Sequence, residues 1–153
     1  MKQLKLGSPQ ISLLKKLCEA IAVSGDEAEV RQIVRAEVEP FVDEIKVDGI
    51  GNLLAIKHRT KPRGLRVLIA AHMDEVGFMV VARDGDGFYR FKKIGGIAAH
   101  HLVGKQVLTG KAHHPGVIGI PPIHTLTSNE LSKSVDLDDL RIDVGKNTEL
   151  RVG

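Results

Sequence analysis

The spacing of the apolar residues changes along this chain, and that change constrains the fold more than any other feature. Between residues 8 and 38 the apolar residues recur at helical intervals, which predicts amphipathic helices. From Ile45 onward they form short runs separated by turn-rich segments, which is typical of strands. The sequence therefore predicts an α/β region over residues 1–80, followed by an all-β region over residues 81–153 with the strand spacing of a small barrel or sandwich.

Two helices are expected near the N-terminus. The first starts at Ser8-Pro9, with proline at an early helical position, and its apolar face contains Ile11, Leu14, Leu17, Cys18 and Ile21. The second is expected near Ser24, where Ser24-Gly25-Asp26-Glu27 matches a capping box, and Pro40 ends it. Its apolar face contains Val30, Ile33, Val34 and Val38.

Short strands are expected through the rest of the chain. A hairpin is predicted from residues 45–47 and 53–56 around the turn at residues 48–52. Val67–Ala71 and Phe78–Ala82 are continuous apolar runs, typical of strands covered on both faces. Further strands are predicted at Phe88–Lys92, Gln106–Thr109, Gly116–Ile120 and Arg141–Val144, and a short helix at Ser128–Leu131.

Composition excludes several classes of protein. With 22 basic and 19 acidic residues, no Trp and one Tyr, the chain has neither the charge nor the stacking platforms typical of nucleic-acid binding. The basic stretch Lys57–Arg66 contains Pro and Gly and is interpreted as a solvated hairpin loop. The apolar runs are too short to span a bilayer. The single cysteine, Cys18, is typical of a reducing compartment, so we expect a cytoplasmic protein.

The segment Ala70-Ala71-His72-Met73-Asp74-Glu75-Val76-Gly77 carries the most distinctive chemistry. On an extended backbone the side chains of His72 and Asp74 project to one face, whereas that of Glu75 points away. An imidazole binds zinc or cobalt, and a nearby carboxylate can orient it. The C-terminal end of a central strand is also where α/β folds place their sites. Spacing alone leaves two interpretations open, a polar strand end and a metal site.

Motifs in a fixed order over nearly the whole chain resemble those of one peptidase family. They are Val23–Glu27, Val47–Leu53, Ala70–Phe78, Ile94-Gly95-Gly96, Gly116–Gly119, Pro121–His124 and Leu140–Gly145, after a looser match at Leu13–Leu17. The family is that of the tetrahedral aminopeptidases, dinuclear metallopeptidases that include glutamyl and deblocking aminopeptidases. Some of its relatives carry the label endoglucanase.

The resemblance implies a fold, a reaction and site residues. The expected fold is an incomplete N-terminal part of a metallopeptidase α/β domain, followed by a small β-barrel-like dimerisation insertion. The expected reaction is removal of N-terminal residues from peptides by an enzyme that holds two divalent metal ions, zinc or cobalt, and assembles into dimers and dodecamers. His72 matches a metal ligand, and Asp74 matches the catalytic-site aspartate that orients it.

The rest of the family's site is not expected in this chain. The resemblance implies further acidic ligands, a catalytic glutamate and a distal histidine after the insertion, and none of those motifs precedes Gly153. We therefore interpret the chain as truncated or shortened, expect little peptidase activity from it alone, and expect an apolar face to be left exposed. The role of Glu75 is left open, as either a group supporting the site or a strand-end charge.

The other histidines are expected to lie outside the site. His58 falls in the solvated basic loop. The adjacent pairs His100-His101 and His113-His114 would point to opposite faces of an extended backbone, so neither pair chelates easily, and both are expected at the surface. For His124 a structural role is favoured.

Two other functions remain as alternatives. The chain could be a non-catalytic fragment or degenerate relative that acts only in oligomer assembly. An endoglucanase is less well supported, because glycoside cleavage usually needs two carboxylates that flank a groove. The adjacent pair Asp138-Asp139 is better explained as part of a solvated turn or helix end.

Overall fold

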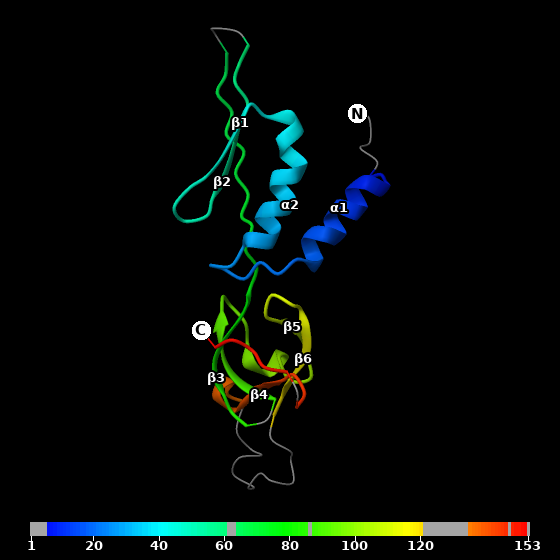
Figure 1. Cartoon of the computed structure of the whole chain (residues 1–153), viewed down its shortest axis with the longest axis vertical. Coiled ribbons are helices and arrows are strands. Elements are labelled where there is room, and N and C mark those ends of the chain that lie inside the picture. Colours follow the sequence, from blue (N-terminus) through cyan, green and yellow to red (C-terminus); the bar gives the residue numbers. More distant parts are fainter. Residues whose placement is uncertain (1–5, 61–63, 86, 121–134, 147, 153) are drawn as a thin grey trace. The chain divides into compact units, whose positions relative to one another are not determined.

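The computed structural model of the chain describes residues 6–60, 64–85, 87–120, 135–146 and 148–152 (Figure 1). The chain divides into two compact units, Met1–Glu75 and Val76–Gly153. The predicted boundary between residues 80 and 81 falls inside the first strand of the second unit, β3 (Gly77–Arg83). The expected order, an α/β part followed by an all-β part, is confirmed.

The first unit contains two helices and a hairpin. Helix α1 spans Ser8–Glu19 and α2 spans Ala28–Val38, followed by a 3-10 turn, Glu39–Phe41, that contains Pro40. Strands β1 (Glu44–Val47) and β2 (Leu53–Ile56) pair antiparallel, with Ile45 opposite Ala55. Asp48 closes the turn between them, because its carboxylate accepts the N–H groups of Ile50 and Asn52 at 3.1 and 2.9 Å. The two predicted helices and the predicted hairpin are therefore present.

The predicted start of the second helix at Ser24 is wrong. Gly25 adopts φ +94°, a left-handed conformation, and the chain turns there instead of entering a helix. The Glu27 carboxylate accepts the Gly25 N–H at 2.6 Å, and helical bonding begins with the Arg31 N–H and the Glu27 carbonyl at 2.9 Å. The Ser24 hydroxyl is thus available for a contact elsewhere in the unit.

The core of the first unit is small. Its buried residues are Ala20, Ala22 and Val30, against which Leu17, Ile33, Val34 and Met73 pack. On the apolar face of α1, Ile11 and Leu14 remain 58% and 59% exposed. The helix therefore buries only part of the face that its periodicity predicts.

The prediction of a buried strand at Val67–Ala71 is wrong. The segment from Gly64 to Asp74 forms no strand, and Val67, Leu68 and Ile69 are 78%, 90% and 89% exposed. A strand exists only where neighbouring strands bond to it, and in the described part of this unit the hairpin of β1 and β2 is the one sheet. Every residue of Val67–Ala71 is apolar, as in a central strand covered on both faces. The strands that would flank such a strand are missing from the described part of this unit. The exposed apolar face expected from the sequence is present here.

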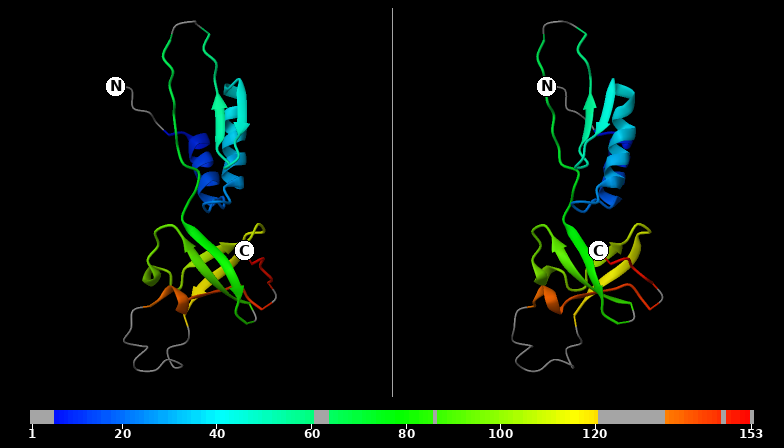
Figure 2. Two further views of the ribbon diagram at one scale, coloured as in Figure 1. Left: turned by 90° about the vertical axis from the view of Figure 1, so that its left-hand side faces the viewer. Right: turned by 60° about the vertical axis from the view of Figure 1, so that its left-hand side comes forward.

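The second unit is a five-stranded antiparallel sheet with the order β3-β4-β7-β6-β5. After β3 come β4 (Phe88–Ile94), β5 (Gln106–Thr109), β6 (His114–Gly119) and β7 (Arg141–Asp143). The sheet is curled, as both views in Figure 2 show. All five predicted strands of this region are confirmed, whereas the predicted helix at Ser128–Leu131 lies outside the described residues.

A row of buried side chains crosses the middle of this sheet. Tyr89 of β4 lies opposite Ile142 of β7, which in turn lies opposite Ile118 of β6. All three are at most 1% exposed. Phe91 is buried on the same face and packs edge-on against Phe78, with ring centroids 4.9 Å apart. The alternation of buried and exposed residues along β4 therefore builds the core of the unit.

The turn between β3 and β4 requires glycine. Gly87 has φ +78°, and a Cβ atom there would lie 2.5 Å from the carbonyl oxygen of Gly145. Its own carbonyl accepts the Val144 N–H at 3.0 Å. The turn predicted from Asp84-Gly85-Asp86-Gly87 is therefore confirmed at its described positions, and it also holds the chain that follows β7.

A search of the described residues finds no helix long and apolar enough to cross a bilayer.

Replacing Ile118 by alanine should destabilise the second unit by about 2–5 kcal/mol, because it removes a buried side chain from the centre of the sheet. Val117 precedes it on β6, points to the other face and is 43% exposed, so Val117→Ala should cost less than about 1 kcal/mol. Urea denaturation followed by circular dichroism measures both values. Equal losses for the two variants would contradict this core.

The exposed segment Leu65–Ala71 should cause the chain to self-associate, because unpaired apolar strands seek partners. Ile69→Lys should weaken the association measured by sedimentation velocity over a range of concentrations. Ile50 is equally exposed, at 85% against 89%, but lies in the hairpin turn, so Ile50→Lys should have little effect. A wild-type chain that sediments as a monomer at every concentration would contradict the prediction.

Candidate functional site

The structure brings His72 and Asp74 together. His72 Nδ1 lies 2.9 Å from the main-chain oxygen of Asp74 and 3.1 Å from its Oδ1. Both oxygens can only accept, so Nδ1 carries the hydrogen and donates it. In the neutral ring the lone pair then resides on Nε2. Since the His72 side chain is 85% exposed, that lone pair is open to a ligand.

Ser24 also contacts this pair, and the sequence interpretation missed it. The Ser24 hydroxyl donates to Oδ2 of Asp74, so the two carboxylate oxygens have separate partners, Ser24 and His72. The sequence interpretation assigned Ser24 to a helix cap. The contact joins residues 50 positions apart, and a local pattern carries no signal for it.

Backbone bonding holds the Ser24 and Asp74 segments side by side. The N–H of Glu75 donates to the carbonyl of Ala22 at 2.7 Å, and Val23 forms a parallel bridge with Glu75. Met73 packs against the buried cluster of Ala20, Ala22 and Val30. The pairing places Ser24 beside Asp74.

The hydrogen bonds keep Asp74 ionised. Its pKa lies below the ordinary aspartate value, chiefly because the Ser24 hydroxyl donates to the carboxylate and secondly because His72 does. Hydrogen bonds to the charged form favour that form. At neutral pH a carboxylate anion therefore faces the imidazole.

The surroundings of this pair differ from the sequence prediction in one respect. His72 was expected at the end of a buried strand, and the preceding residues are instead exposed and outside any strand. The pair is consequently open to solvent. The main-chain N–H of Glu75 bonds to Ala22, and Glu75 itself is exposed to solvent.

The remaining described histidines are distributed over the surface. His58 is exposed in the basic segment, where its N–H donates to Asp43 at 2.6 Å. His100 and His101 are exposed in a 3-10 turn, Ala99–His101, with their rings edge-on and 4.1 Å apart, so the assumption of an extended backbone is wrong there. His114 is exposed on β6 as predicted. His113 is half-buried and has φ +52°, so the expected surface position and extended backbone are wrong for it. His124 lies outside the described residues.

Nowhere in the part of the chain that the structure describes do three His, Cys, Asp or Glu side chains gather as a metal site would require. At His72 the described residues bring together one histidine and one carboxylate, joined by a hydrogen bond.

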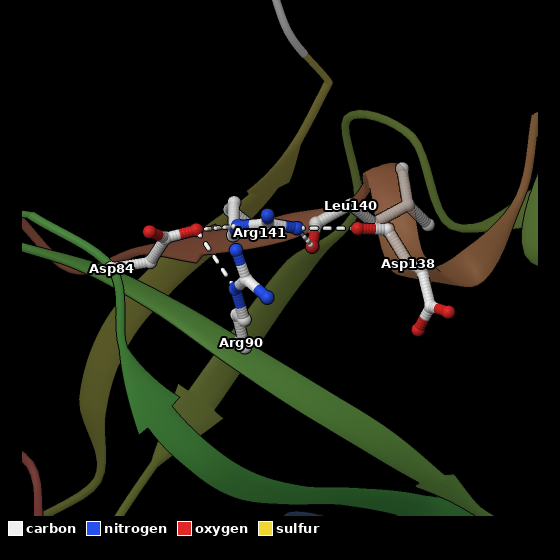
Figure 3. Close-up of polar contacts among 5 residues, drawn as sticks. All are labelled: Asp84, Arg90, Asp138, Leu140 and Arg141. Carbon is white, nitrogen blue, oxygen red and sulfur yellow. Dashed lines mark hydrogen bonds and ion pairs between the residues drawn. The ribbon is translucent and has the colours of Figure 1, made fainter.

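A second charged cluster lies in the second unit and has a structural explanation. Asp84, in the β3–β4 turn, accepts from Arg90 Nε at 3.0 Å and from Arg141 Nε (Figure 3). Arg141 also donates to the carbonyls of Asp138 and Leu140 at 2.6 and 2.8 Å. These contacts tie the turn to β7 and to the 3-10 turn Leu137–Asp139 that precedes it. The acidic stretch around Asp138-Asp139 is thus a surface turn, as predicted.

Comparison with known proteins identifies a family. The model of the M42 glutamyl aminopeptidase family matches residues 51–152 of this chain. Among curated proteins, "Putative aminopeptidase FrvX" of Escherichia coli strain K12 is 43% identical over 146 residues, which is 93% of this chain and 40% of that protein.

Solved structures give the same result. The TET aminopeptidase of the marine archaeon Thaumarchaeota archaeon SCGC AB-539-E09 aligns with a TM-score of 0.77 and 37% identity, covering 89% of this chain and 38% of that one. The Pyrococcus horikoshii TET1 peptidase, described as able to assemble into a tetrahedron or a large octahedral shell, aligns with a TM-score of 0.71 and 36% identity, covering 89% and 40%. The chain spans about 40% of the length of each of these three relatives.

Replacing Asp84 by asparagine should flatten the dependence of stability on pH. Arg141 first, and Arg90 second, hold the pKa of Asp84 below its ordinary value of 3.8. A lowered folded-state pKa contributes stability that is present above the unfolded-state value and is lost as the pH falls toward the folded-state value. The Tm of the wild type should therefore fall more steeply than that of Asp84→Asn below about pH 5.

Asp138→Asn is the matched control, because only the main-chain oxygen of Asp138 takes part in the cluster (Figure 3). Its Tm should follow that of the wild type through the acidic range. Parallel curves for all three proteins would show that the Asp84 carboxylate is not stabilised as described.

Proposed function

Because the chain belongs to the M42 glutamyl aminopeptidase family, we propose that it forms part of a metal-dependent aminopeptidase that removes N-terminal residues from peptides. In this proposal His72 is a ligand of the metal centre and Asp74 is the catalytic-site aspartate that orients it. The carrying observation is the hydrogen bond from His72 Nδ1 to Asp74, which leaves Nε2 free and exposed.

The donor set fits one ligand position of a zinc or cobalt site. Imidazole is a good ligand for both ions, and a ligating histidine usually donates its other ring N–H to a carboxylate or carbonyl, as His72 does. The negative charge of Asp74 increases the basicity of Nε2 and keeps the ring in the tautomer that can bind a cation. When bound, the two metal ions would polarise the scissile carbonyl and lower the pKa of the attacking water.

The remaining ligands and the catalytic glutamate are proposed to lie outside this chain. This placement is supported by the share of the Escherichia coli relative that the chain spans, 40%. The chain alone should then bind metal weakly and have little or no peptidase activity. A cytoplasmic location is part of the same proposal, with the exposed thiol of Cys18 compatible with a reducing compartment.

We also propose that the protein is a homo-oligomer, a dimer or a dodecamer, with the second unit as its dimerisation domain. The support is that a relative 36% identical to this chain is described as forming closed shells. If the chain acts only in assembly, it should oligomerise without any dependence on His72. An endoglucanase would need a pair of carboxylates across a groove, and Asp138-Asp139 lie in a surface turn instead.

The first test is a titration of the purified chain with cobalt and zinc, followed by calorimetry and the visible spectrum of cobalt. His72→Ala should weaken binding by more than about tenfold. His58 is an exposed histidine in the same unit, so His58→Ala is the matched control and should leave binding unchanged. Equal affinity in the wild type and His72→Ala would refute the assignment of His72 as a ligand.

The second arm of this test is turnover of aminoacyl-p-nitroanilides with and without metal. The chain alone should show little or none. Metal-dependent turnover that is abolished in His72→Ala would support the aminopeptidase but contradict the placement of the missing catalytic residues outside the chain.

A further inference from the structure

The contact between Ser24 and Asp74 gives the candidate site a third member. We propose that Ser24 is a positioning residue, whose hydroxyl holds one oxygen of the Asp74 carboxylate so that the other is aimed at His72 Nδ1. In its consequence for metal binding, the inference rests on the proposed function. The arrangement of hydrogen bonds itself does not.

A carboxylate needs such a restraint when it is open to solvent. The Asp74 side chain is 42% exposed. The χ2 angle, which rotates an aspartate carboxylate about its Cβ–Cγ bond, has a broad distribution in proteins, so the carboxylate rotates with little hindrance. One bond to His72 leaves the carboxylate free to turn toward water. A second bond, from Ser24 to the opposite oxygen, removes that freedom and keeps Oδ1 at 3.1 Å from the imidazole.

Ser24 can act as a restraint because its own main chain is held. The Asp26 N–H donates to the Val23 carbonyl at 2.7 Å, and the left-handed Gly25 completes this turn. On the other side, the Glu75 N–H donates to the Ala22 carbonyl at 2.7 Å. The hydroxyl is therefore presented from a segment that is bonded directly to the one carrying Asp74.

Both hydrogen bonds in this group of three residues end on the same acceptor. Ser24 donates to Asp74, and His72 donates to Asp74, so the carboxylate is the shared acceptor. Removing the hydroxyl should therefore loosen the carboxylate and reduce the preference of the neutral His72 ring for the Nδ1–H tautomer. The reduction should be partial, because the main-chain oxygen of Asp74, at 2.9 Å from Nδ1, still accepts this hydrogen. The Nε2 lone pair would then be available for a smaller fraction of the time, and a cation would bind less tightly.

The test reads the tautomer directly in the metal-free, full 153-residue chain. Nitrogen-15 NMR at a pH at which the imidazole is neutral distinguishes Nδ1–H from Nε2–H. The wild type should show mainly the Nδ1–H form, and Ser24→Ala should move His72 toward the Nε2–H form. Ser24→Thr keeps a hydroxyl and should restore the wild-type spectrum, which a merely structural role for the small side chain would not predict.

Ser12→Ala is the matched control, since Ser12 is an exposed serine of α1 in the same unit. Its spectrum should match the wild type, and circular dichroism on every variant establishes that the unit is folded. An unchanged His72 tautomer ratio in a folded Ser24→Ala chain would overturn the proposal. A shift that Ser24→Thr fails to reverse would also count against the hydroxyl.

The metal arm separates this inference from the proposed function. Cobalt affinity should fall about tenfold in Ser24→Ala and recover in Ser24→Thr, as for other groups that orient a ligating histidine. If the wild type binds no cobalt, the proposed function fails while the tautomer measurement still decides the role of Ser24. If the wild type binds cobalt and Ser24→Ala binds it equally well with the same tautomer ratio, the inference about Ser24 fails alone.

Discussion

Backbone pairing of Glu75 with Ala22 and Val23 underlies the geometry of the candidate site. It joins the turn that follows α1 to the segment that carries His72 and Asp74. Met73, from the second of these segments, packs against the buried cluster of Ala20, Ala22 and Val30. The pairing places the segments of Ser24 and Asp74 side by side, and the serine hydroxyl reaches the carboxylate from there.

The two units differ in how far their own residues cover their apolar surface. In the second unit the alternation along β4 and its partners puts Tyr89, Ile118 and Ile142 on one face of a curled sheet, which closes over them. In the first unit, Val67–Ile69 and part of the α1 face stay exposed. An isolated apolar strand has neither the hydrogen bonds nor the covering layers that would order it, since both come from neighbours rather than from its own sequence.

This difference explains what could be predicted from the sequence. The helices, the hairpin and the five strands of the sheet are encoded in local periodicity and turn residues, and the structure confirms them. The strand at Val67–Ala71 was predicted wrongly, because an apolar run indicates only that a strand is possible where partners exist. The cap at Ser24 was predicted wrongly because a left-handed Gly25 redirects the chain, and the serine bonds to a residue 50 positions away. His100 and His101 lie at the surface as predicted, but their backbone is a tight turn and is not extended.

At the candidate site, the sequence motif predicts which residues can meet, and the structure shows which atoms donate and which accept. The spacing of His72 and Asp74 predicted that they could face one another, but a histidine next to an aspartate is equally compatible with an ordinary polar surface. The structure adds the direction of the hydrogen bonds, because Nδ1 faces two oxygens that can only accept. That direction leaves Nε2 as the ring atom with a lone pair, and it makes Asp74 an acceptor that Ser24 can hold from its other oxygen. A surface pair needs neither the fixed tautomer nor the second restraint, whereas a ligand that must present one nitrogen to a cation benefits from both.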